Sequence, residues 1–115
     1  GISVVTHQTL ESQRAWSMEL YRVLRPKGVA ILSFNGEFTL SKVSDRQVHS
    51  VMQTGFDDSH RDANLDGFIP SEDYYRLTLQ TRAHFEKLFS EYFDVLDIIP
   101  AGCASVQDLA VLQKK

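Results

Sequence analysis

The stretch ELYRVLRPKGVAILSF, residues 19–34, decides the fold of this chain. Its first part closes a helix, because the residue before Pro26 avoids the helical conformation, and a turn follows at Pro26–Gly28. The run Val29–Phe34 is continuously apolar, which is typical of a strand covered on both faces. Helix, turn and buried strand in this order predict part of a βαβ unit, which needs a preceding parallel strand. The last residues of that strand are expected at Gly1–Ser3.

The helix before this turn is expected over Ser12–Leu24, with Thr9 or Ser12 as its N-cap. Four apolar residues follow the i, i+4, i+7, i+8 spacing of one helix face: Trp16, Leu20, Val23 and Leu24. That spacing predicts a single buried stripe.

The rest of the chain predicts an insertion followed by a helix and two strands. Residues Glu37–Gln80 are polar and irregular, so we expect an insertion that contains short helical pieces. A helix is expected over Thr81–Tyr92, with Phe85, Leu88, Phe89 and Tyr92 on one side. Strands are expected at Phe93–Ile99 and Leu109–Leu112, and the short loop between them predicts an antiparallel pair.

In this order the pieces resemble a known family. The segments SVVTHQ (residues 3–8), ELYRVLRPKG and VAILSF are similar to the region after the fourth strand of class I, Rossmann-like S-adenosylmethionine-dependent methyltransferases. The C-terminal YFDVLDIIPAGCASVQDLAVLQKK (residues 92–115) resembles the closing antiparallel hairpin of that family. Lys27 stands where the family usually has a glycine, and the resemblance does not extend well over residues 38–71.

The resemblance implies an α/β fold: a partial Rossmann-like methyltransferase sheet with flanking helices and a C-terminal antiparallel strand pair. Residues 1–115 would form the C-terminal part of a methyltransferase domain, with 37–80 as an insertion. The family's glycine-rich loop and the acidic residue that hold the cofactor are not found in this sequence. We therefore expect the N-terminal cofactor-binding half upstream of Gly1.

The function implied is the transfer of a methyl group from S-adenosylmethionine to a small-molecule or sugar-like acceptor. The isolated chain is expected to be inactive. Ligands of open α/β sheets bind outside the carboxyl ends of the parallel strands. By resemblance, the segment after the fourth strand lines the methionine end of the cofactor, so Ile2, Ser3 and His7 are the candidate cofactor-binding residues. No catalytic residue is assigned.

Each polar residue at this edge also has a purely structural interpretation. His7 can act beside the ligand or as a general base, or it can bond a backbone carbonyl near a helix start. Asn35 can contact an acceptor or cap a turn. Gln107 and Asp108 can face a ligand or make hydrogen bonds at a strand end, and Tyr74–Tyr75 can line an acceptor pocket or pack in the core.

A second motif supports an alternative function. Residues Asp62–Asp73 match the twelve-residue calcium loop at the oxygen positions one, three and five and at the glycine of position six. Asp73 replaces the bidentate Glu of position twelve, and Pro70 occupies position nine, so an acidic surface turn fits the same residues. The alternative is a non-catalytic structural or calcium-binding module.

Composition limits the partners. The net charge is -3 with scattered basic residues, which argues against a nucleic-acid surface. No apolar run approaches the roughly 20 residues of a membrane span. The single cysteine, Cys103, cannot form an internal disulfide, which favours a reducing, cytoplasmic location. Without the upstream half, the edge of the strand Val29–Phe34 should be uncovered, so we expect the fragment to self-associate.

Overall fold

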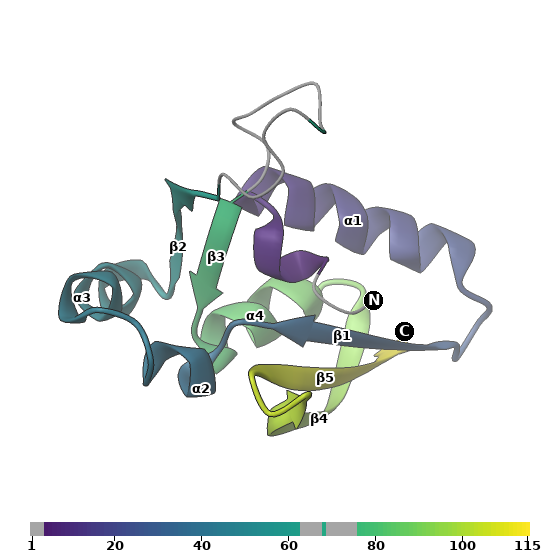
Figure 1. Cartoon of the computed structure of the whole chain (residues 1–115). Helices are drawn as coiled ribbons and strands as arrows, with labels where there is room; N and C mark the ends of the chain where they lie inside the picture. Colours follow the sequence, from purple (N-terminus) through teal and green to yellow (C-terminus); the bar gives the residue numbers. More distant parts are fainter. Residues whose placement is uncertain (1–3, 63–67, 69–75) are drawn as a thin grey trace.

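The computed structural model describes residues 4–62, 68 and 76–115. They form a compact α/β fold of helices and two antiparallel sheets (Figure 1). The elements in chain order are η1 (Val5–His7), α1 (Leu10–Val23), β1 (Val29–Phe34), α2 (Glu37–Leu40), α3 (Asp45–Thr54), β2 (Phe56–Arg61), β3 (Arg76–Gln80), α4 (Arg82–Phe89), β4 (Phe93–Cys103) and β5 (Gln107–Lys114). None of the described helices is both long and apolar enough to cross a membrane.

The larger sheet has the strand order β1-β5-β4, and both pairings are antiparallel. The strand expected at residues 29–34 is confirmed with those bounds, and so is the antiparallel C-terminal pair. The pair is longer than expected because β4 continues as far as Cys103, with a shift in its register with β5 between Ile99 and Cys103. The parallel neighbour expected at Gly1–Ser3 lies outside the described residues.

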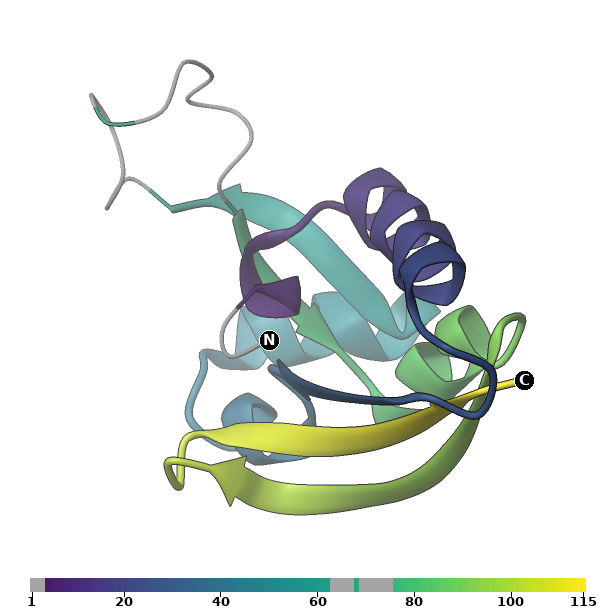
Figure 2. The same cartoon turned by 90° about the vertical axis from the view of Figure 1, so that its right-hand side faces the viewer.

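Helices α1 and α4 lie over one face of this sheet (Figure 2). Beneath them, Phe34 stacks on Phe85 with ring centroids 4.1 Å apart, and Phe85 stacks on Phe89 at 4.5 Å. These three rings are buried at the centre of the main core. The aromatic stack therefore packs α4 against β1. Phe85 and Phe89 lie on the side of this helix that was expected to be apolar.

The expectation that β1 is covered on both faces is wrong for the described part of the chain. Ala30, Leu32 and Phe34 are buried, whereas the side chains of Val29 and Ile31 are 49% and 52% exposed. The exposed side chains lie on the face of the sheet away from α1 and α4, which both cover the opposite face (Figure 2), and only Ser33, near the end of the strand, is buried on the exposed face. An apolar run of this length does not reveal that one face is open.

The buried side of α1 agrees only in part with the expected stripe, of which Leu20 and Leu24 pack against the main core. Gln13 and Ser17 are the buried residues of the helix, whereas Trp16 and Val23 are exposed. Gln13 is buried because its Nε2 donates to the carbonyl oxygen of Val5 at 3.0 Å. This tertiary hydrogen bond, which apolar periodicity does not include, sets the rotation of the helix. The N-cap is Thr9, as expected, and it accepts from the backbone of Ser12.

Residues 37–80 contain the expected short helices, α2 and α3, but also a strand pair that was not expected. A capping box at Ser44 starts α3, and Gly55 ends it at a φ of 84°, a left-handed conformation that favours glycine. The chain then enters β2, which pairs antiparallel with β3. The sequence of β2, FDDSHR, lacks an apolar alternation, so its pairing with β3 is what identifies it as a strand.

The exposed indole of Trp16 and the buried aromatic stack together give one prediction about stability. Phe85→Ala should lower the free energy of unfolding by about 3–5 kcal/mol, because it leaves a cavity between two stacked rings. Trp16→Ala should cost about 1 kcal/mol or less, because the indole is 44% exposed. Urea unfolding followed by circular dichroism measures both, and equal losses would show that α1 is placed wrongly.

Candidate functional site

The carboxyl end of β1 is where the sequence places a ligand, and η1 comes to this end. His7, the last residue of η1, is partly buried, and its Nδ1 lies 2.9 Å from the carbonyl oxygen of Arg76 at the start of β3. The same nitrogen lies 3.7 Å from Asp62 Oδ2. The backbone contact considered above is therefore present, while contact with a cofactor stays a prediction. Ile2 and Ser3, the other two candidates, lie outside the described residues.

Asn35 follows β1 and joins it to β3. Its Nδ2 donates to the carbonyl oxygen of Thr78 at 3.0 Å, and its own carbonyl oxygen accepts from the backbone of Gln80 at 3.0 Å. The side chain is 5% exposed. Asn35 thus bonds to β3 through both its side chain and its main chain. Its side-chain amide connects the end of the larger sheet to the smaller one.

Thr78 extends this connection to the segment after η1. Its hydroxyl donates to the carbonyl oxygen of Gln8. Thr78 therefore bonds to both Gln8 and Asn35, and these contacts place residues 7–8 beside the carboxyl end of β1. The sequence pointed to His7 and Asn35 at this edge but not to Thr78, because β3 was not expected.

Asp108 pairs with Phe34 across the β1–β5 ladder and is almost fully buried. Its Oδ1 accepts from the backbone of Ala101 at 2.9 Å. A Cβ added to Gly36 would collide with Oδ2 of this carboxylate and come within 2.7 Å of the Phe34 ring. Asp108 therefore makes a hydrogen bond at a strand end, as its structural interpretation requires. The absence of a side chain at Gly36 leaves room for the Asp108 carboxylate.

Several buried polar atoms have no hydrogen-bond partner within the described part of the chain. They come from the η1–α1 segment and from β3: Thr6 Oγ1, Gln8 Oε1, Gln13 Oε1, Ser17 Oγ and Gln80 Nε2. Buried polar groups are normally paired, since leaving one unpaired costs roughly 1–3 kcal/mol. Such a concentration is unusual for a purely structural core, and apolar periodicity gave no signal for it.

The described residues hold no group of three or more His, Cys, Asp or Glu side chains suited to a metal ion. The calcium-loop motif starts at Asp62, which is described, but residues 63–67 and 69–73 lie outside the described residues. The calcium interpretation therefore stays a prediction. Tyr74–Tyr75 also lie outside the described residues.

A cavity of about 500 Å³ opens elsewhere, between α1 and α4. Its walls include Arg14 and Ser17 from α1 and His84 and Lys87 from α4, and it shares no lining residue with the β1 edge. Burial lowers the pKa of His84, and the nearby positive charges of Arg14 and Lys87 lower it further. Sequence analysis missed this site because it treated Leu88 and Tyr92 as packing residues and gave no role to the polar residues beside them.

Comparisons with known proteins do not assign a function. No family model, no curated protein and no solved structure matches the chain.

The bond of Asn35 to β3 can be tested with an isosteric change. In Asn35→Asp, a carboxylate oxygen replaces the donor that faces the Thr78 carbonyl, so the protein should lose about 2 kcal/mol or more at pH 7. Burial should raise the pKa of the new carboxyl above its unfolded value. The loss should therefore shrink as pH falls, because the protonated carboxyl can donate to that carbonyl.

The matched control is Gln53→Glu, the same amide-to-carboxylate exchange at an exposed position of α3. It should change stability by no more than about 0.5 kcal/mol at any pH. Urea unfolding of both variants and the parent chain from pH 4 to pH 8 makes the comparison. A pH-independent loss in Asn35→Asp would contradict the assigned hydrogen bond.

Proposed function

We propose that this chain is the C-terminal part of a Rossmann-like S-adenosylmethionine-dependent methyltransferase that acts on a small-molecule or sugar-like acceptor. One observation carries the proposal. The helix, turn and strand of residues 10–34 are followed by a closing antiparallel hairpin, and the last strand of that hairpin pairs with β1 along its whole length. This is the order of elements on which the resemblance rests.

The position of residues 7–8 adds support. They lie at the carboxyl end of β1 through the contacts of Thr78 with Gln8 and Asn35, and ligands of α/β sheets bind at such ends. Methyl transfer to a nucleophilic acceptor depends mainly on positioning. Asn35, Thr78 and Asp108 are buried and hydrogen-bonded, so they suit the role of a rigid support rather than of an acid or base.

The described residues of this edge do not by themselves fit a whole cofactor. Both hydrogen-bonding groups of Asn35 described above and one oxygen of Asp108 are engaged by the chain itself. Ligand affinity requires that most of the ligand be buried and its polar groups satisfied. We therefore propose that an upstream half supplies the rest of the cleft, and that Ile2, Ser3 and His7 line the methionine end. The single free cysteine agrees with a cytoplasmic location, which we also propose.

Calorimetry with S-adenosylmethionine tests the proposal. The present chain should show no detectable binding, and the chain extended by its natural upstream sequence should bind. In the extended protein, His7→Ala should weaken binding more than His49→Ala, which removes an exposed imidazole from α3. An extended protein that ignores the cofactor would refute the methyltransferase assignment.

The same preparations separate the calcium-module alternative. That alternative requires calcium to raise the melting temperature, because a ligand that binds only the folded state stabilises it. The rise should disappear in Asp62→Ala and Asp66→Ala. Calcium stabilisation together with an extended protein that does not bind the cofactor would favour the module over the enzyme.

The open face of the larger sheet predicts that the isolated chain associates with itself. Val29, Ile31 and Ile99 are each more than 40% exposed and, by the strand register, lie on the face away from α1 and α4. Exposed apolar patches of this kind mark contact surfaces. The chain should form dimers or larger species in sedimentation at high concentration, and Ile31→Asp should shift it toward monomer. A monomeric parent chain would exclude this.

A further inference from the structure

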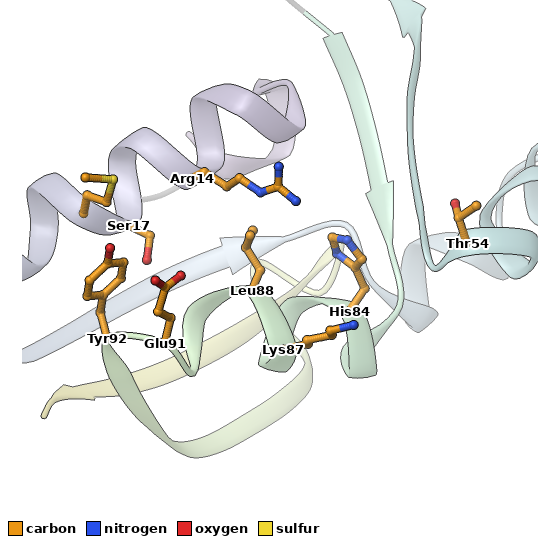
Figure 3. Close-up of a pocket in the computed structure, with 9 residues that line it drawn as sticks. Arg14, Ser17, Thr54, His84, Lys87, Leu88, Glu91 and Tyr92 are labelled. Atoms are coloured by element: carbon orange, nitrogen blue, oxygen red, sulfur yellow. The ribbon is translucent and has the colours of Figure 1, made fainter.

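The cavity between α1 and α4 has no role in the proposed function, and its walls are chemically polarised (Figure 3). One end carries Arg14 from α1 and His84 and Lys87 from α4, whose side chains extend toward the same space. Met18 and Leu88 contribute apolar side chains to the lining. At the other end lie Ser17, Glu91 and Tyr92.

The positive end lacks compensating charge. Neither Arg14 nor Lys87 forms an ion pair with a carboxylate among the residues that the structure describes. Other arginines on the same two helices are paired: Arg22 with Glu19 on α1, and Arg82 with Glu86 on α4. Gathering unpaired positive groups around a partly buried imidazole is unfavourable in the absence of an anion.

A second, independent observation comes from Ser17. Its side chain is 2% exposed, it lines the cavity, and its hydroxyl has no hydrogen-bond partner within the described part of the chain. A buried hydroxyl without a partner is costly, and a polar ligand group in the cavity would satisfy it. The cavity thus contains a hydroxyl without a hydrogen-bond partner in its wall, as well as positive side chains without an ion-pair partner at one end.

We propose that this cavity binds a small organic phosphate. The phosphate lies among Arg14, His84 and Lys87, and the organic part lies along Leu88 and Met18 with a polar group at Ser17. Two cations from two helices, with His84 as a further donor that becomes positive when an anion binds, suit an anion with oxygens in several directions, whereas a carboxylate presents only two oxygens in a plane. The volume of about 500 Å³ is in the range of known small-molecule sites.

His84 couples this site to pH. Its Nδ1 lies 3.3 Å from Gln80 Oε1, which accepts from this nitrogen when the nitrogen carries a proton. The charged groups of the cavity that act on His84 are Arg14 from α1 and Lys87 from α4, whereas Glu91 lies at the other end of the cavity and α3 contributes the neutral Thr54. A bound anion favours the imidazolium, so binding should take up a proton and strengthen as pH falls.

Inorganic sulfate is the first probe, because it has the shape of phosphate and keeps its charge between pH 5 and 8. Nuclear magnetic resonance of the His84 ring during a sulfate titration should show saturable shifts, stronger at pH 6 than at pH 8. Inorganic phosphate should produce the same pattern of shifts at fixed pH. Sodium acetate at equal ionic strength should not, and an equal acetate effect would overturn the preference for a tetrahedral anion.

Matched variants separate a site from general charge attraction. Arg14→Gln and Lys87→Gln should each weaken sulfate binding roughly tenfold or more, the effect of losing a hydrogen bond to a charged group. Arg22→Gln and Arg82→Gln remove the same charge from the same helices outside the cavity, and should leave the affinity unchanged. Equal weakening in all four variants, or no saturable shift in the parent chain, would overturn the proposal.

A loss of folding would not explain weaker binding in these variants, because the side chains of Arg14 and Lys87 are exposed. Circular dichroism of each variant checks that it is folded. The test is also independent of the methyltransferase proposal. Sulfate binding, together with an extended protein that does not bind S-adenosylmethionine, would support this site and refute that function. Cofactor binding by the extended protein without sulfate binding would support that function and refute this site.

Discussion

The hydrogen bonds that Asn35 makes to β3 hold the two sheets of this protein together. Phe34 ends β1 inside the main core, and the next residue bonds to both Thr78 and Gln80. The smaller sheet therefore begins where the larger one ends, and Thr78 passes the connection on to Gln8. The segment that enters α1 thus takes its position from β3, although some seventy residues of sequence separate the two.

This dependence explains which parts of the fold the sequence could predict. Pro26–Gly28, the apolar run after it and the cap Thr9 act over a few residues, so α1 and β1 were predictable nearly to their ends, whereas α4 ends at Phe89 and not at the expected Tyr92. The closing hairpin was predictable because a short loop allows only antiparallel pairing. The pair β2–β3 was not, because FDDSHR carries no strand pattern and is ordered by a partner distant in sequence.

The rotation of α1 shows the same limit within one helix. Trp16 has the greater apolar surface, yet Gln13 occupies the buried side because the carbonyl of Val5 needs a donor there. Burial of amides and hydroxyls in place of apolar groups leaves this part of the protein with unsatisfied polar atoms. The candidate residues at the β1 edge were partly predictable, since a strand end can be located from sequence, whereas the cavity between α1 and α4 depends on how two helices face each other.

The close approach of Gly36 to Asp108 has an evolutionary consequence. A side chain at position 36 would occupy the space of the Asp108 carboxylate, and that carboxylate also supports Ala101, which has a φ of 53° in the left-handed region. In related sequences, a larger residue at position 36 should therefore occur only with a shorter one at position 108. Position 101 should then favour glycine, since the left-handed backbone would have lost the bond that supports it. The three positions should vary as a set.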